Sequence, residues 1–354
     1  MKNGRTLVEL ATELQRQLPT KQDLVVTSTA LSVSTDETGA SRMTVSAPGS
    51  HLSFGMTELA RRQLADKLKI PFAYFERMRT DQPALLDRNV NTWLQTEDER
   101  RMIRTLDGDV RAVLSDRYRR LDNADLAEHL LPILQQLPGA RFESLELTDT
   151  RMYLKVVTPS VKEEIVPGDM VQAGVVISNS EVGQGTLSVQ PLVYRLVCRN
   201  GLIAQDHALR KTHVGRSVQG EEGGLTVYRD DTLAADDRAF FLKVRDVVAA
   251  AVSEATFGPL VAKMRQTRGI RLTGDPVRSV EVLGTRFNLN DQERTGVLRQ
   301  LIEGGELSAY GLVNAVTHYS QEVDNYDRAT DLELLGGRMI DLDRKQWHEI
   351  AEAA

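Results

Sequence analysis

The chain has 354 residues, of which 41% are hydrophobic and 27% are charged, and its 44 basic and 50 acidic residues leave a net charge of −6. This ordinary composition predicts a soluble globular protein of one large domain or two, which needs neither disulfides nor metals to bury a core. The acidic balance excludes a globally basic nucleic-acid protein, although a local basic face remains compatible with it. The single cysteine, Cys198, excludes a disulfide framework or a multi-thiolate metal site within one chain.

No targeting or membrane segment is predicted. The first fifteen residues interleave charged and apolar side chains, unlike the apolar region of a signal peptide. The longest apolar stretch lies near 244–252, is interrupted by Arg245 and Asp246, and is far shorter than the ~20 residues that cross a bilayer. We therefore expect an intracellular, cytoplasmic protein.

Residues 1–100 predict an N-terminal α+β region. Hydrophobic periodicity predicts, in chain order, a helix within 1–20, strands over 24–33 and 42–45, and helices over 56–68 and 71–79. The last two helices share the outline of a DNA-reading helix-turn-helix, but two helices joined at a proline are more often plain packing.

Residues 101–257 predict a β-rich core with a long helix. The pattern predicts a hairpin at Asp107-Gly108, a helix capped by Asp122, strands over 142–147, 152–157, 171–178 and 186–189, a loop over 161–167, and a helix over 234–257 stopped by Gly258-Pro259. The segment 191–199 is ambiguous. Pro191 and Asn200-Gly201 favour a short helix, whereas a strand would place Pro191 at its start or at an edge.

Residues 258–354 predict a helical C-terminal region, with helices beginning near Asp291 and Ser308. From residue 318 onward four basic residues face nine acidic ones, so the chain ends in an acidic tail. Together these regions predict an α+β fold. A central antiparallel sheet over about 100–190 would pack against helices on one side.

Motifs for catalysis are weak in this sequence. It contains neither a phosphate-binding P-loop nor a His-Glu-x-x-His zinc motif, and Gly183-Gln184-Gly185 fits a hairpin tip better than a dinucleotide fingerprint. Asp116, Asp122 and Asp125 lie among arginines, as expected of a salt-bridged and capped helix start. The sequence therefore predicts a non-enzymatic protein without cofactor or metal.

Basic residues give the stronger signal. Three segments, 101–120, 189–216 and 258–286, carry an excess of three, four and four positive charges. Arg and Lys lining a groove neutralise phosphates, and nearby tyrosines could stack on bases of a single strand. The alternative is a set of solvated faces paired with the acidic tail, and composition alone does not choose between the two.

Several strings resemble a known family. They are the segments 104–119, 174–183, 191–201, 213–216 and 310–317, which read RTLDGDVRAVLSDRYR, GVVISNSEVG, PLVYRLVCRNG, HVGR and YGLVNAVT. Their order resembles the phage/plasmid-like protein family, a domain of unknown function 932, over about residues 50–340. The resemblance implies a product of phages, plasmids or integrated elements. It also implies a distant similarity to phage single-strand annealing proteins, which form rings or filaments and hold DNA without ATP or metal.

We therefore expect a homo-oligomeric protein that binds and anneals single-stranded DNA in phage- or plasmid-type recombination. Arg195 and Arg199, four residues apart, would share a face of either a helix or a strand and line the DNA groove. The other expected nucleic-acid-binding residues are Arg117, Arg119, Asn179, Ser180, Tyr194, Arg210, Lys211 and Arg216. The alternatives are an interaction protein that binds a host defence or replication factor through the acidic tail, or a nucleic-acid enzyme without a visible motif.

Overall fold

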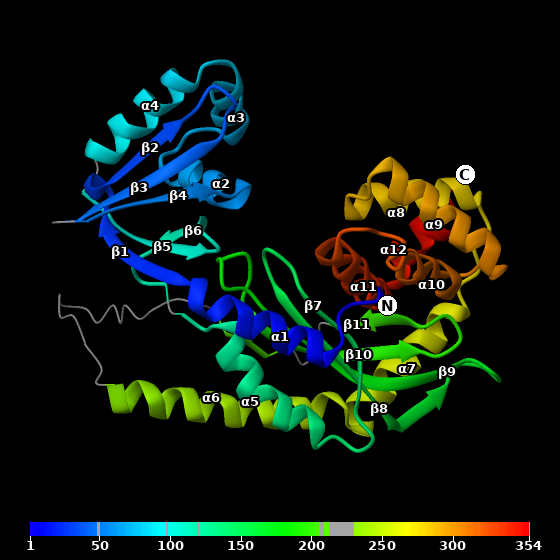
Figure 1. Cartoon of the computed structure of the whole chain (residues 1–354). Helices are drawn as coiled ribbons and strands as arrows, with labels where there is room; N and C mark the ends of the chain where they lie inside the picture. The colour runs from blue at the N-terminus through cyan, green and yellow to red at the C-terminus, as the bar shows by residue number, and fades with distance from the viewer. Residues whose placement is uncertain (48–49, 97, 119, 205–208, 212–229, 354) are drawn as a thin grey trace, which may run out of the picture.

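Two β-sheets and a set of C-terminal helices make up this α+β protein, seen here in a computed structural model (Figure 1). The structure describes residues 1–354 except 48–49, 97, 119, 205–208, 212–229 and 354. Within these described residues, each sheet has six strands. The α+β fold class predicted from the sequence is confirmed.

The first sheet has the order β1-β5-β6-β4-β3-β2, with β4 and β6 parallel and all other neighbours antiparallel. Its strands are β1 (Gln22–Thr27), β2 (Leu31–Thr35), β3 (Ser41–Ala47), β4 (Ser50–Met56), β5 (Arg100–Leu106) and β6 (Asp109–Ser115). A 3₁₀ turn at Ser28–Ala30 divides the predicted strand 24–33 into β1 and β2. The β5–β6 hairpin thus completes a sheet of the N-terminal region, so the predicted sheet over 100–190 is divided between two sheets.

Three helices cover one face of the first sheet. They are α2 (Glu58–Lys67), α3 (Phe72–Asp81) and α4 (Pro83–Thr96). Phe75 and Leu86 from these helices are buried in one cluster with Ile103 and Val113 from the sheet. Thr57 caps α2, because its side chain accepts a hydrogen bond from the Ala60 backbone.

The turn between β5 and β6 explains why this hairpin could be predicted locally. Asp107 and Gly108 both have positive φ values, 53° and 85°. A two-residue turn with that geometry matches the right-handed twist of the flanking strands, and it favours Asp-Gly.

The second sheet is an antiparallel meander with the order β7-β8-β9-β10-β11, and β12 also pairs with β10. Its strands are β7 (Arg141–Leu147), β8 (Met152–Glu164), β9 (Met170–Asn179), β10 (Leu187–Arg195), β11 (Asn200–Ile203) and β12 (Leu209–Lys211). The predicted loop over 161–167 is wrong in its first part, since Lys162–Glu164 pair with β9. Residues 191–195 belong to β10, so the strand alternative holds up to Arg195. The expected place of Pro191 at the start or edge of a strand is wrong, because Pro191 lies in the middle of β10, which pairs with β9 on one side and with β11 and β12 on the other.

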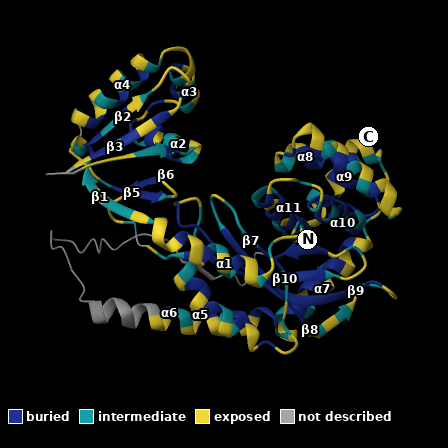
Figure 2. Ribbon diagram, in the orientation of Figure 1, coloured by how far each residue is buried: buried dark blue, intermediate teal, exposed yellow. Residues whose placement is uncertain are grey.

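Alternate residues of β8 face opposite layers, as the two-residue period of a strand requires. Leu154 and Val156 belong to the main core with α1 (Leu7–Gln17), α5 (Asn123–Gln135), α6 (Asp230–Ala251) and α7 (Glu254–Arg268). Lys155 points to α11 (Tyr326–Ile340), where its Nζ donates to the buried Glu333 carboxylate at 2.6 Å. Strands β8 to β11 are therefore buried along most of their length (Figure 2).

The predicted helix over 234–257 is wrong at its end. It divides into α6 and α7, because the Ser253 side chain caps α7 by accepting from the Thr256 backbone. Pro259 lies inside α7 rather than ending a helix, and the buried Phe257 and Leu260 hold that turn against the core. Among the described helices, no single one is long and apolar enough to span a membrane. The segments Arg238–Ala251 and Glu254–Arg268 reach that length and apolar character only when taken together, and they are bent by 48° relative to each other.

The C-terminal region is helical, as predicted. Its helices are α8 (Pro276–Phe287), α9 (Asp291–Gly304), α10 (Ala309–Tyr319), α11 and α12 (Arg344–Ala351). Ser308 caps α10 as predicted, whereas the cap of α9 is Asn290, one residue before the predicted Asp291. Because α10 is surrounded by other elements, most of its side chains are buried.

The contact between α11 and β11 depends on a glycine. A Cβ on Gly337 would lie 2.0 Å from the Ile203 carbonyl oxygen, a backbone atom that cannot rotate away. We predict that Gly337→Ala lowers the free energy of unfolding by roughly 1–3 kcal/mol, as overpacking does. Urea unfolding measures this, with Gly304→Ala as the matched control because a Cβ on Gly304 would meet open space within 4 Å. Equal stabilities of the two variants would contradict the prediction.

Candidate functional site

Arg195, expected to line a DNA groove, is instead held within the protein. Its Nε and Nη2 donate to the Asp169 carboxylate at 2.6 and 2.9 Å, and Tyr310 donates to the same carboxylate at 2.5 Å. Arg199 is exposed and has a φ of 52° in the turn after β10. The two arginines therefore do not share a face of one regular element, because residues 196–199 form a turn rather than a continued helix or strand.

The expected aromatic partner is also buried. Tyr194 is 5% exposed and lies in a cluster with Leu192, Val176 and Ile203. Its ring packs against protein on the face of β10 opposite the main core. In this conformation it is not available to stack on a base, which corrects the role expected for it.

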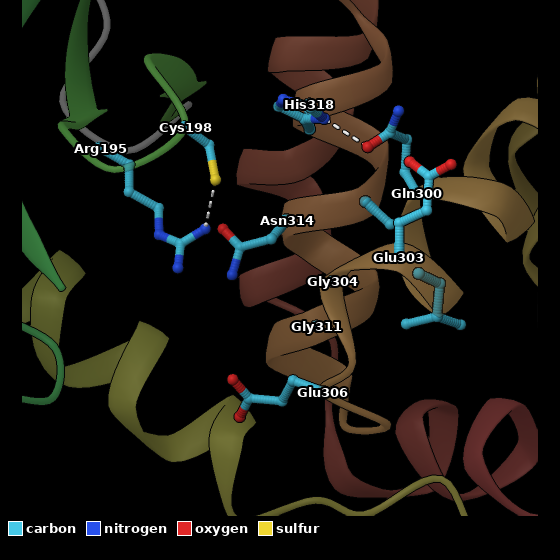
Figure 3. A pocket seen from close by; sticks show the side chains of 11 residues that line it. Arg195, Cys198, Gln300, Glu303, Gly304, Glu306, Gly311, Asn314 and His318 are labelled. Carbon is cyan, nitrogen blue, oxygen red and sulfur yellow. Dashed lines mark hydrogen bonds between the residues drawn. The ribbon is translucent and has the colours of Figure 1, made fainter.

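A pocket of about 260 Å³ opens beside Arg195 (Figure 3). Arg195 and Cys198 form one wall, and the Arg195 Nη1 donates to the Cys198 Sγ at 3.3 Å. Asn314 and His318 of α10 and Glu303 of α9 face them. Two of the strings noted in the sequence, 191–201 and 310–317, thus meet at one cavity.

Burial lowers the pKa of His318 in this pocket from its ordinary value of 6.5, which favours the uncharged imidazole. Its Nδ1 is hydrogen-bonded to the Gln300 side chain. No group of three or more His, Cys, Asp or Glu residues that could hold a metal ion occurs among the residues that the structure describes. The pocket offers hydrogen-bonding and charged side chains rather than a metal-ligand set.

Asn179 and Ser180, expected to donate to phosphates, are almost fully buried. The Asn179 Nδ2 donates to the Leu121 carbonyl at 3.0 Å and to Asn123 Oδ1 at 2.8 Å. The Ser180 Oγ accepts from the Gln184 backbone at 3.0 Å, which shapes the turn between β9 and β10. The expected phosphate contacts of these two side chains are therefore not possible in this conformation.

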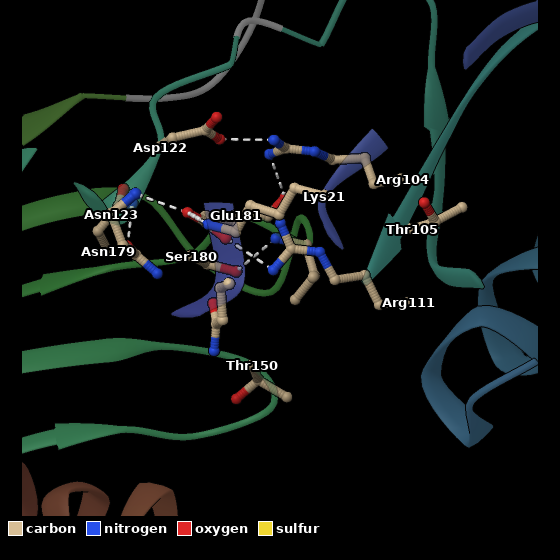
Figure 4. A network of polar contacts seen from close by, with 12 residues as sticks. Lys21, Arg104, Thr105, Arg111, Asp122, Asn123, Thr150, Asn179, Ser180 and Glu181 are labelled. Carbon is tan, nitrogen blue, oxygen red and sulfur yellow. Dashed lines mark hydrogen bonds and ion pairs between the residues drawn. The ribbon is translucent and has the colours of Figure 1, made fainter. Parts of the chain in front are cut away.

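The residue that follows them, Glu181, is the centre of a buried polar network (Figure 4). Glu181 is 1% exposed and accepts hydrogen bonds from Lys21 Nζ at 2.8 Å and from the Asn123 backbone at 2.6 Å. Nη1 of Arg111 lies 2.7 Å from its second carboxylate oxygen. Burial alone would raise the pKa of Glu181, but the charges of Arg111 and Lys21 outweigh it and lower the pKa to about 2.

Arg104 of β5 continues this network and is also 1% exposed. It donates to Asp23 at 2.8 and 3.1 Å, to Asp122 at 2.5 Å and to the Glu181 carbonyl at 2.9 Å. Asp122 does stand at the start of α5, as predicted, but its carboxylate binds Arg104 instead of capping the helix. This network, which we call the joint, connects the first sheet to the β9–β10 turn and to α5. Its members are Lys21, Asp23, Arg104, Arg111, Asp122, Asn123 and Glu181.

Cations from separate chain segments lie around the same turn. Tyr118, which follows the exposed Arg117 in the chain, donates to the Ser180 carbonyl at 2.8 Å. Arg151, from the turn between β7 and β8, donates to the Gln184 carbonyl at 2.5 and 3.1 Å. In β12, Arg210 and Lys211 stand opposite Ser188 and Leu187, the first residues of β10. We call Arg117, Arg151, Arg210 and Lys211 the tip cluster.

Of the expected nucleic-acid-binding residues, Arg117 precedes Tyr118, which contacts this turn, and Arg210 and Lys211 lie in a strand paired with the first residues of β10. Arg195 lies about 23 Å along β10 from Ser188, at ~3.3 Å per residue, so it does not belong to the same group. Arg119 and Arg216 lie outside the described residues. Arg151 was not predicted, because its strand segment has no excess of basic residues and only the fold brings it to the turn.

The third basic segment, 258–286, is largely paired with carboxylates. Lys263 contacts Asp341 at 2.6 Å and Arg286 contacts Glu349 at 2.5 Å, both in the acidic tail. Arg265, Arg268 and Arg278 also contact carboxylates, those of Glu163, Glu306 and Glu281. For this segment the structure favours the alternative of faces paired with acidic residues.

Residues 110–335 match the family described as Domain of unknown function (DUF932), and the chain belongs to this family. The match begins in β6 and ends in α11. It therefore includes the pocket, the β9–β10 turn and the four residues of the tip cluster. No curated protein and no solved structure matches the chain.

The lowered pKa of Glu181 generates a pH prediction. A depressed carboxyl pKa stabilises the folded state above the unfolded pKa, near 4.5, and this contribution is lost as the pH falls towards about 2. We predict that Glu181→Gln lowers the free energy of unfolding by about 3 kcal/mol at pH 7, and that the difference from wild type shrinks below pH 4.5.

Chemical unfolding at several pH values between 7 and 3 measures this difference. Glu303→Gln is the control, because that carboxylate is exposed. If the free energy of unfolding of Glu181→Gln stays below that of wild type by a constant amount down to pH 3, the lost stability comes from packing rather than from the charge of Glu181.

Proposed function

We propose that this DUF932 protein binds single-stranded nucleic acid across the β9–β10 turn, through the tip cluster. The observation that carries the proposal is that three segments containing basic residues adjoin one turn: Arg151 donates to the Gln184 carbonyl, Tyr118 beside Arg117 donates to the Ser180 carbonyl, and the strand of Arg210 and Lys211 pairs with the first residues of β10. Arg and Lys side chains that track a phosphate backbone release counterions, and this gives affinity without reading sequence. Annealing without ATP, in recombination of the phage or plasmid type, extends the proposal from the family resemblance.

Charge balance supports this location over the other basic segments. Inside the joint, three cations face three carboxylates, so the buried network needs no further anion. Most of the basic residues of 258–286 already contact carboxylates of the chain itself. Arg117 is exposed at the turn, and Arg210 and Lys211 stand in a strand beside it. A phosphate backbone would supply anions for residues at this location.

The turn itself supports close approach of a strand. Gly183 is exposed and has a φ of 76°, so the backbone at the tip carries no side chain there. A Cβ at this position would also lie 2.7 Å from Leu114 of the first sheet. The tip is therefore both narrow and fixed, as a surface for backbone contacts should be.

The alternatives gain less support. The acidic tail, proposed as a docking segment for a host factor, is engaged within the chain through Glu333, Asp341 and Glu349. No observation favours a nucleic-acid enzyme over a binding protein. The proposed homo-oligomer rests on the family resemblance alone. Basic residues of 258–286 pair with carboxylates of the acidic tail within one chain rather than between subunits.

The salt dependence of binding tests the proposal. We predict that the triple variant Arg117→Ala, Arg210→Ala and Lys211→Ala reduces the slope of log affinity against log salt by roughly 2, at ~0.7 per single-strand phosphate. The measurement is fluorescence anisotropy of a labelled oligothymidine over a salt series, with thermal melting to confirm folding.

Arg199→Ala is the matched control, since Arg199 is exposed but lies at the other end of β10. Its slope should equal that of wild type. An unchanged slope in the triple variant, or an equal loss in Arg199→Ala, would reject the tip cluster as the binding surface.

A further inference from the structure

The pocket beside Arg195 lies away from the tip cluster and plays no part in the proposed function. Its floor is a single face of α10, formed by Gly311, Asn314, Ala315 and His318 at helical spacing. Most other side chains of α10 are buried among neighbouring elements. The floor of the pocket is therefore a rigid surface, unlike a loop that could collapse into the cavity.

One wall carries the Arg195 guanidinium, which is ion-paired with Asp169 and still presents Nη1 as a hydrogen-bond donor. The bidentate contact with Asp169 fixes the Arg195 guanidinium, which also lies 5.6 Å from the centre of the Tyr310 ring. Its Nη1 donates to the Cys198 sulfur, which is a weak acceptor. An oxygen anion in the pocket would accept that hydrogen more strongly than sulfur does. The Asn314 amide lies beside this guanidinium (Figure 3).

The opposite wall is negative. It is the C-terminal end of α9, where the helix dipole places partial negative charge, and it carries the exposed carboxylate of Glu303. Glu306 lies at the lower edge, where its Oε1 accepts from Arg268 at 3.0 Å and from Ser308 at 3.2 Å. Burial lowers the pKa of His318, so its imidazole favours the uncharged form and adds no positive charge beside these carboxylates.

The close approach of the Glu306 segment to α10 depends on Gly311. A Cβ there would lie 1.8 Å from the Glu306 carbonyl oxygen. The Gly311 backbone also donates to the Ser308 side chain at 3.1 Å, which holds the start of α10 against this segment. The segment that carries Glu306 is therefore held at a fixed distance from the floor formed by α10.

We propose that this pocket binds a small zwitterion of amino-acid size, with its carboxylate towards Arg195 and Asn314 and its ammonium group towards Glu303 and Glu306. A cavity of about 260 Å³ limits the ligand to roughly this size. Opposite charges on facing walls distinguish a molecule with both groups from a simple amine or a simple acid. No covalent step is involved.

Cys198 provides the assay, because it is the one cysteine of the chain and lies in the pocket wall. Each of the nineteen standard amino acids other than cysteine, whose own thiol would consume the reagent, is tested singly, at millimolar concentration, for slowing the alkylation of Cys198 by iodoacetamide. We expect at least one to slow the reaction tenfold or more. Its decarboxylated amine should protect at least tenfold more weakly at the same concentration.

Two variants complete the test. Glu303→Gln should weaken protection by the active amino acid at least tenfold, whereas Glu281→Gln, which removes a carboxylate of α8 outside this pocket, should not change it. Thermal melting without ligand confirms that both variants fold. Failure of all nineteen amino acids to protect, equal protection by the amine, or indifference to Glu303→Gln would each overturn the proposal. None of these results bears on oligonucleotide binding.

Discussion

A buried carboxylate, that of Glu181, sets how the two sheets of this protein lie against each other. Removing an ion from water costs several kcal/mol, so a buried charge is tolerated only with partners in place. The partners of Glu181 come from the residue before β1, from β6 and from the start of α5. Val182 then packs with Met102 and Leu114 of the first sheet, and Gln63 donates to its carbonyl at 2.7 Å. The joint forms only when all these segments are present together.

The same turn that carries Glu181 also carries the proposed binding surface. Outside the joint, Arg117 is exposed and Arg151 donates to the Gln184 carbonyl of this turn. At the other end of β10, Arg195 is committed to Asp169 and Tyr310 and helps form a pocket instead. One strand therefore connects two surfaces of different chemistry, about 23 Å apart at ~3.3 Å per residue. The pairing of Arg195 with Asp169 is what removes it from the groove expected from the sequence.

Local signals in the sequence predicted what local interactions determine. Asp107-Gly108 requires only its own backbone geometry to form a hairpin turn, and Ser308 caps α10 with its own side chain. Contacts between distant segments could not be predicted in this way. Asn179 and Ser180 look like turn residues in sequence, yet burial against the start of α5 removes them from solvent. The pairing of β6 with β4, the place of Arg151 and the pocket beside Arg195 likewise exist only through tertiary contacts.

The central claim is that nucleic acid contacts the β9–β10 turn rather than the turn after β10. Amide hydrogen exchange of the full chain, with and without an oligothymidine, tests it most directly. The account predicts slower exchange on binding in residues 115–118, 148–151 and 181–186, and unchanged exchange in residues 196–199. Slower exchange in 196–199 with no change around the β9–β10 turn would contradict the account.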